Sequence, residues 1–542
     1  MRKRVRQPAT KCSWIRTIHL KIFTNRRQLC STTPGRAEAM NKRFYITAMV
    51  LVSLVACWGN TAAAQDFETV SGRNLWNSGD NVTGIAQDST SISYAEIYAG
   101  GKAGGFHSYG DASSFWKAGA VAESILHAGK FSFTGKFAFE QWQGKDMYGS
   151  IFLQPGFYPI DVLEFTPGVK SMQKYIVNGG LSYNLEKCWR LGVAVDFDAT
   201  NLAKRKDLRY TDYRLDVSVR PAFMWHKGDW AAGVSAVLGK NSETAAAEVV
   251  GTVESTYYAF IDKGLMYGRY ESWEGSGIHL SEAGVSGLPL REVFSGIAVQ
   301  MSWKGLFAQL GYERSFGKAG EKDYIWFEFP ADRVHGNISG RINSSKGEHF
   351  LRLEFSNRYL SNTEHILEKK TENGVPVVER QASNVILRRN SLEFHPEYEY
   401  KSDFWELKWT ADGLWHRGIG SQMYPLAVQQ DMVNCRTAIK AVIHPWIFDV
   451  GAEIRAGKGL LRERSRAVES AEGKIPDRIE SHYDWTAAFV RTPWMGGSLF
   501  LSCRFWKGMY VKAEAGADCA LLRSLPFGHL RWGGNIVLGL AL

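Results

Sequence analysis

Hydrophobic and polar residues alternate along the segment Tyr213–Trp225. One face would carry Tyr213, Leu215, Val217, Val219, Pro221, Phe223 and Trp225, and the other Arg214, Asp216, Ser218, Arg220, Ala222 and Met224. A period of two belongs to a β-strand, in which successive side chains face opposite sides. Strands in soluble proteins usually have about 5–6 residues, whereas longer strands with aromatic ends on an apolar face cross bilayers in barrels. The segment therefore predicts a spanning strand with its apolar face towards lipid and its charged face towards a lumen.

The same unit of strand, tight turn and strand recurs after Gln65. Turns rich in Gly, Asp or Pro are expected at His226–Asp229, Trp303–Leu306, Ser344–Gly347, Lys401–Asp403, His444–Pro445 and Trp506–Gly508. Longer polar connections are expected at Thr200–Asp212, Asn241–Phe294, Gly317–Arg333, Ser361–Ser383 and Gly457–Ser481. No helix-period block of useful length and no apolar run of 18 residues follows Gln65. The pattern predicts an all-β, transmembrane antiparallel up-and-down barrel of about 16–18 strands, with short periplasmic turns and long extracellular loops.

The front of the chain has the layout of a secretory signal peptide. Met40–Arg43 is basic, Phe44–Ala56 is apolar, and Ala62–Ala64 forms a small-residue cleavage site. The expected organisation is a mis-annotated upstream extension at 1–39, a signal peptide at 40–64, a periplasmic or lumenal segment at 65–91, and the barrel at 92–542. Two alternatives stay open, namely a long basic leader from Met1 and a lipidated Cys57.

Charge and cysteine content narrow the possible partners. The net charge of +10 arises in residues 1–64, which hold 12 Lys/Arg and one acidic residue, so the remainder is close to neutral. We therefore exclude nucleic acid as a partner. After the leader, Cys188, Cys435, Cys503 and Cys519 remain. Hairpin register would put Cys503 opposite about residue 511, too far from Cys519 for a disulfide.

Motif spacing offers no metal site, no cofactor site and no catalytic set. An enzyme whose residues meet only in three dimensions stays open. The charged positions expected to face the lumen are Asp196, Asp198, Arg214, Asp216, Arg220, Arg352, Glu354, Glu393, Glu397, Glu406 and Lys408. They would either line a path that selects solutes or form cross-strand ion pairs that stiffen the wall. We favour the ion pairs, because both signs occur on neighbouring strands.

The N-terminal third resembles a family of uncharacterised outer-membrane β-barrels of Gram-negative, Bacteroidota-type bacteria. The residues that carry the resemblance are Asn74–Gly84, Phe106–Tyr109, Ala122–Ser124 and Asp207–Asp212. Members are often encoded beside TonB-dependent receptors. The resemblance implies location and fold, and no established activity.

Together these features predict a non-enzymatic outer-membrane barrel that admits or transports solutes or assists a TonB-dependent uptake system. A barrel enzyme acting on lipid or peptide, a structural or adhesive barrel, and a soluble secreted all-β protein are the alternatives. Expected partners are outer-membrane lipid, the barrel assembly machinery and a TonB-dependent receptor. We do not expect a TonB-dependent importer itself, because the mature chain would leave no room for a plug domain. The aromatic-rich connection Asn241–Phe294 would form a constriction or an external surface, and packing against other loops is favoured.

Overall fold

The computed structural model describes residues 67, 72, 74–206, 209–248, 257–265, 268–273, 288–321, 324–421, 427–445, 447–463, 477–506, 508–522 and 524–541. The expected upstream extension, the signal peptide and the alternatives at Met1 and Cys57 lie outside these residues.

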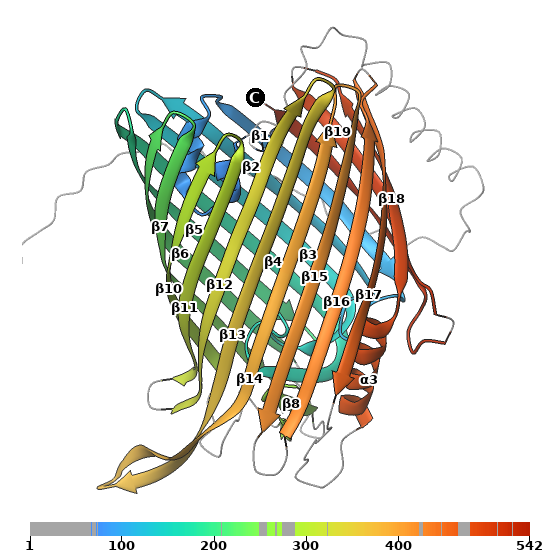
Figure 1. The fold of residues 1–542 in the computed structure, drawn as a ribbon. Helices are drawn as coiled ribbons and strands as arrows, with labels where there is room; N and C mark the ends of the chain where they lie inside the picture. The colour runs from blue at the N-terminus through green and yellow to red at the C-terminus, as the bar shows by residue number, and fades with distance from the viewer. Residues whose placement is uncertain are drawn as a thin grey trace, which may run out of the picture. The chain divides into compact units, whose positions relative to one another are not determined.

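Within the described residues, eighteen strands close into one antiparallel barrel (Figure 1). The strands are β1 (Ile92–Gly104), β2 (Ser114–Ala128), β3 (Phe131–Ser150), β4 (Asp161–Glu186), β5 (Trp189–Lys204), β6 (Arg209–Lys227), β7 (Trp230–Glu248), β10 (Leu288–Trp303), β11 (Leu306–Glu321), β12 (Tyr324–Ser344), β13 (Gly347–Glu372), β14 (Val375–Lys401), β15 (Trp405–Ser421), β16 (Ala427–Ile443), β17 (Phe448–Glu463), β18 (Trp494–Arg504), β19 (Met509–Ala520) and β20 (Leu530–Ala541). Each strand pairs with the next, β7 pairs with β10, and β20 pairs with β1 to close the wall. The predicted fold class and strand number are confirmed.

Five further elements of the described residues are not strands of this wall. The 3-10 helices η1 (Leu75–Ser78) and η2 (Val82–Gln87) precede β1, and the helix α3 (Asp477–Arg491) lies between β17 and β18. The hairpin β8 (Tyr257–Asp262) and β9 (Gly268–Trp273) lies between β7 and β10, and β8 pairs with the start of β4. None of the described helices is long and apolar enough to cross a membrane.

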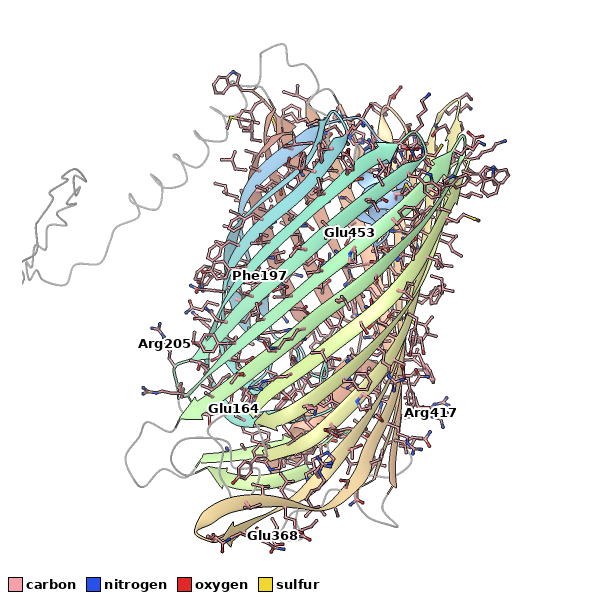
Figure 2. The ribbon with its side chains drawn as sticks, turned by 90° about the vertical axis from the view of Figure 1, so that its left-hand side faces the viewer. Glu164, Phe197, Arg205, Glu368, Arg417 and Glu453 are labelled. Atoms are coloured by element: carbon pink, nitrogen blue, oxygen red, sulfur yellow. The ribbon has the colours of Figure 1, made fainter. Side chains whose placement is uncertain are left out.

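The wall has the predicted alternation of faces. On β6, Tyr213 is 58% exposed and faces outward, whereas Met224 is fully buried on the lumen side. Figure 2 shows side chains along the outer wall, with Phe197 of β5 between the two ends of the barrel. The outward apolar residues have no protein neighbours to cover them, which is the arrangement of a wall that faces lipid.

The two ends of the barrel differ. At one end, here called the short-turn end, tight turns join β2 to β3, β6 to β7 and the corresponding later pairs. At the other, the long-loop end, the connections are longer or the strands extend far past their neighbours. The β13–β14 hairpin extends furthest at this end (Figure 1), and Glu368 lies near its tip in Figure 2.

The expected boundaries of the long connections were wrong, because strands continue into them. Thr200–Asp212, Gly317–Arg333 and Ser361–Ser383 are mostly strand, and Asn241–Phe294 is strand at both ends and contains β8 and β9. Beyond the membrane a strand has no lipid to face, so the apolar half of the alternation disappears although the pairing continues.

The helix α3 was not expected, and that interpretation is corrected. Its buried residues are Ile479, Tyr483 and Ala487, spaced four apart on one face. Three buried positions in one short helix give a weak periodic signal. The register expected for the cysteines is confirmed, because Cys503 lies opposite Val511 and Cys519 lies opposite Met495.

Candidate functional site: a charged chamber in the lumen

The barrel lumen holds a cavity of about 1070 Å³, here called the chamber. Its wall comes from lumen-facing residues of β5–β7 and β10–β17. Four other segments also line it: the N-terminal segment through Asp80, the β3–β4 loop through residues 154–160, the β8–β9 hairpin through residues such as Asp262, and α3 through residues such as Tyr483. The chamber therefore lies between segments that fold into the barrel from both ends.

The N-terminal segment, residues 74–88, is held in the lumen by polar contacts with the wall. The Asn81 amide donates hydrogen bonds to the carbonyl oxygens of Phe223 (3.1 Å) and Val234 (3.4 Å) and to Gln300 Oε1 (3.1 Å). Asn81 Oδ1 accepts a bond from the Thr83 backbone N–H and so caps η2. Three wall strands are thus joined to one side chain.

Asp80 adds a charged contact to the same wall. Its carboxylate lies 3.0 Å from His335 Nε2 and 3.5 Å from Arg220 Nη1. Burial alone would raise the pKa of Asp80, but the His335 hydrogen bond and the charges of His335 and Arg220 outweigh it and lower the pKa. Asp80 therefore stays ionised and attached to the wall.

Apolar contacts complete the seating of this segment. Trp76 is buried, packs edge-on against Phe307 at 5.2 Å, and donates from Nε1 to Ser302 Oγ at 2.9 Å. Val82 packs in a small buried cluster with Ala194 and Ala222 of the wall. The segment is a fitted closure at the short-turn end of the lumen.

The β3–β4 loop enters the lumen from the long-loop end through a tight turn. The Phe157 N–H donates to the Gln154 carbonyl at 3.1 Å, with Pro155 and Gly156 in the two central positions. Gly156 has φ +79°, the value that a type II turn requires and that glycine adopts without strain. Residues 154–157 are called the loop tip below.

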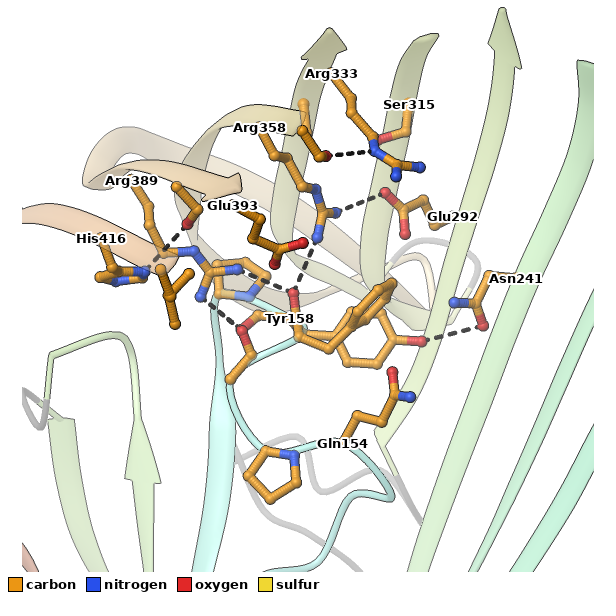
Figure 3. Close-up of a pocket in the computed structure, with 18 of the residues that line it drawn as sticks. Gln154, Tyr158, Asn241, Glu292, Ser315, Arg333, Arg358, Arg389, Glu393 and His416 are labelled. Atoms are coloured by element: carbon orange, nitrogen blue, oxygen red, sulfur yellow. Dashed lines mark hydrogen bonds and ion pairs between the residues drawn. The ribbon is translucent and has the colours of Figure 1, made fainter. Parts of the chain in front are cut away.

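Three arginines from distant strands hold the loop tip, and Figure 3 labels two of them, Arg358 and Arg389. Arg389 donates to the carbonyls of Gly156 (2.8 Å), Phe157 (3.0 Å) and Tyr158 (3.4 Å), and Arg358 donates to that of Phe157 (3.3 Å). Arg214 donates to Gln154 Oε1. The Phe157 ring centroid lies 4.7 Å from the guanidinium carbon of Arg214 and 5.0 Å from that of Arg358. Besides these polar and cation–π contacts, the Phe157 ring packs against the apolar cluster of the loop flanks and meets the Tyr158 ring edge-on at 4.9 Å.

The flanks of the loop are anchored differently. Ile151, Phe152, Tyr158 and Ile160 are buried in an apolar cluster with residues of the wall and of the β8 strand. Burial of such side chains stabilises by roughly 1.5–3 kcal/mol each, whereas a cation–π contact contributes about 0.5–1 kcal/mol at exposed sites. The flanks are therefore held more strongly than the exposed residues 154–156 of the tip.

The helix α3 packs against the mouth of the lumen. The Trp485 Nε1–H donates to the His107 carbonyl at 3.0 Å, and the His482 ring meets the Tyr109 ring edge-on at 4.4 Å. Burial lowers the pKa of His482 to about 4, so the ring is neutral near pH 7. The aromatic-rich connection also packs inward: Phe260 of β8 is buried with Leu163 and with Ile479 of α3.

Of the five charged residues predicted to face the lumen on β5 and β6, four line the chamber and one lies elsewhere on the barrel wall. Asp196 pairs with Arg220 at 2.6 Å, and Asp216 lies 3.8 Å from Arg214. These four line the chamber. Asp198 instead pairs with Lys174 of β4 at 2.8 Å.

Most of the predicted residues on β13–β15 form ion pairs near the short-turn end. Glu397 accepts from both Arg352 and Lys408, and Arg352 also lies 3.4 Å from Glu354. Glu406 pairs with Lys401 at 3.6 Å. Among these predicted residues, Glu393 is the one that lines the chamber.

Sequence reasoning missed Asp80, Asn81, Phe157 and Arg389. A Pro-Gly pair between the apolar runs 151–153 and 157–160 was the available signal for an inward loop. Arg389 carries no such signal, because its partners lie more than 200 residues away in the chain. In the described part of the chain, no group of three or more His, Cys, Asp or Glu side chains is placed to hold a metal ion.

The comparisons with known proteins assign a family. Residues 82–455 match the model of a family of unknown function, DUF6850. The chain belongs to this family. A search of the curated proteins finds no match.

Several solved structures are weakly similar to this member of DUF6850. The ferric citrate transporter FecA has a TM-score of 0.38 and 8% identity, covering 83% of this chain and 78% of that chain. The ferric yersiniabactin uptake receptor FyuA from Yersinia pestis has a TM-score of 0.37 and 8% identity, and the likeness covers 84% of this chain and 80% of that chain. The RagAB peptide transporter has a TM-score of 0.35 and 10% identity, and the likeness covers 74% of this chain and 57% of that chain. At these values the likeness carries no argument about function.

Proposed function

We propose that this chain is a non-enzymatic barrel of the Gram-negative outer membrane that admits or transports a solute through its lumen. The outward apolar face and the difference between short turns and long loops support this location. In this proposal the short-turn end faces the periplasm, and export uses the signal peptide predicted from Met40. Outer-membrane lipid, the assembly machinery and a TonB-dependent receptor are the proposed partners.

The observation that carries the proposal is the chamber between two inward-folded closures. This lumen holds a cavity of about 1070 Å³ lined by charged side chains of both signs, which a purely scaffolding or adhesive role would not require. Each closure is a short segment with both apolar and polar contacts to the wall, and the polar contacts can exchange with water or with solute. In this proposal each closure narrows the path, and movement of either one widens it.

Conductance in planar bilayers tests the proposal. The intact protein is expected to conduct weakly, and deletion of residues 74–88 is expected to raise the conductance several-fold. Heat-dependent gel migration would verify that the barrel of the deletion variant is intact. If neither protein passes ions or small solutes although both are folded, the transport proposal fails.

One observation favours the enzyme alternative. At the long-loop end, Ser383 Oγ lies 2.8 Å from His365 Nδ1, and His365 Nε2 lies 3.3 Å from Glu328 Oε2 without hydrogen-bond alignment. This is the order of a nucleophile, a base and an acid. Against it, the neighbouring backbone N–H groups belong to strand ladders and leave no evident pair of donors for an oxyanion. Hydrolysis of phospholipid or ester substrates that disappears in Ser383→Ala would favour the enzyme.

A further inference from the structure

We propose that Arg358 and Arg389 form a binding site for a carboxylate or phosphate group, and that such a group releases the loop tip from the lumen. The inference rests on the proposed uptake function and adds the class of solute. It follows from how the two guanidinium groups are occupied in the closed barrel.

Arg389 is bound by acceptors that are weak for a guanidinium. All three are neutral backbone carbonyls, those of Gly156, Phe157 and Tyr158. No carboxylate forms an ion pair with Arg389 in the part of the chain that the structure describes. A guanidinium presents a planar fork of N–H donors that matches carboxylate and phosphate oxygens, and bonds to ionised acceptors are roughly twice as strong as those to neutral ones. An anionic group that reaches Arg389 would therefore outcompete the carbonyls of the tip.

Arg358 brings a second positive charge to the same place. Both arginines donate to the Phe157 carbonyl, so their guanidinium groups lie side by side (Figure 3). Glu292 is the carboxylate paired with Arg358, at 3.1 Å. Asp262, whose charge acts on Arg389, and Glu393 also line the chamber, so a ligand anion would compete for the N–H donors of the two guanidinium groups rather than fill a site of net positive charge.

Binding of the anion and closure of the tip compete for the same donors. The side chains at Gln154 and Pro155 are exposed, whereas the flanking Ile151 and Ile160 are buried. A Cβ at Gly156 would contact nothing within 4 Å, so open space surrounds the turn. In this proposal the tip swings out while its flanks stay packed, which requires the Phe157 ring to leave its contacts with the apolar cluster. The same two arginines would thus recognise the solute and unlock its path.

A matched ligand series in planar bilayers tests this inference on the full chain. Glucose 6-phosphate, gluconate and glucose have similar size and differ in charge. The two anions are expected to raise the open probability about tenfold or more, and glucose is expected to have no effect. Inorganic phosphate forms a further arm: if it opens the channel at the same concentration, the anion site is supported and free phosphate is its ligand.

Variants separate binding from simple loosening of the tip. Arg389→Gln is expected to raise basal opening, because the tip loses its holder, and to lose at least about tenfold in anion affinity by calorimetry. Arg352→Gln is the matched control, since Arg352 lies on β13 like Arg358 but pairs with Glu397 and Glu354 outside the chamber. The control should keep both the low basal opening and the anion response.

The outcomes are distinguishable. A conducting wild type that ignores both anions, or an Arg389→Gln protein that still responds to them, overturns the inference. If calorimetry shows anion binding that Arg389→Gln abolishes, but no variant conducts, the anion site stands and the transport proposal fails.

Discussion

Val82 packs into a gap in the barrel wall that Gly180 leaves open. A Cβ built at Gly180 would lie 2.6 Å from Val82 Cγ2, closer than real Cβ contacts come. Gly192 on the neighbouring strand leaves a similar gap, with 2.7 Å to Val82 Cγ1. The N-terminal segment therefore packs where two glycines of the wall have no side chains. A substitution at one of these glycines can disturb the packing without changing the segment itself.

Gly180→Val is expected to expel the N-terminal segment without unfolding the barrel. Overpacking costs typically 1–3 kcal/mol, and the segment can relieve that cost by leaving its seat. Faster proteolysis within residues 74–88 and higher conductance should follow. Gly179→Val is the control, because a Cβ at Gly179 meets nothing within 4 Å. Equal effects of the two substitutions would mean that the barrel, and not the seat, had been damaged.

Val219→Arg is expected to destabilise the barrel in lipid by about 2–4 kcal/mol if Val219 lies near the middle of the membrane. Val219 is outward-facing and lies opposite the exposed Leu238. Ser218→Arg should cost less, because Ser218 lines the chamber and bonds Asp196 at 3.1 Å. Denaturant unfolding of the refolded variants measures both, and similar losses would show that the assignment of faces is wrong.

Acidification is expected to loosen α3. Because burial lowers the pKa of His482 to about 4 from an ordinary 6.5, the released helix binds a proton that the packed helix excludes. The contribution of neutral His482 to the stability of the packed helix is thus fully present above pH 6.5, and it decreases as the pH falls towards 4. Hydrogen exchange of residues 477–491 should speed up over this range. His482→Gln should remove this pH dependence, and an unchanged pH profile in that variant would contradict the assignment.

The sequence was informative wherever a strand faces lipid. Alternation predicted the strand at residues 213–225, and turn chemistry predicted the turn at Trp303–Leu306. The structure has both. The same signal disappears where strands leave the membrane, which is why β13 was predicted to end too early and β14 to begin too late. Lipid imposes the pattern, so the pattern reports only the part of the wall that meets lipid.

The chamber was predictable in part. Asp196, Arg214, Asp216 and Arg220 follow from strand parity, which fixes the face of each residue. Parity gives no information about which segments fold inward. The bonds from Asn81 to Phe223 and from Arg389 to Gly156 join positions more than 140 residues apart and depend on the closed barrel. The loop tip and the N-terminal seat therefore needed the structure.

Glu397→Gln is expected to destabilise the barrel by about 1–3 kcal/mol. Its side chain is 3% exposed and accepts from both Arg352 and Lys408. Loss of its charge leaves two cations near each other without their shared acceptor. Breaking a fully buried pair costs more, about 3–5 kcal/mol, but Arg352 and Lys408 are about a third exposed, so solvent screening reduces the loss.

Glu354→Gln is the control: Glu354 is 41% exposed and touches Arg352 from one side, so its loss should cost under about 1 kcal/mol. Denaturant midpoints of the two variants give the comparison. Equal midpoints would mean that Glu397 is one more solvated wall charge and that the ion pairs do not stiffen this end of the barrel.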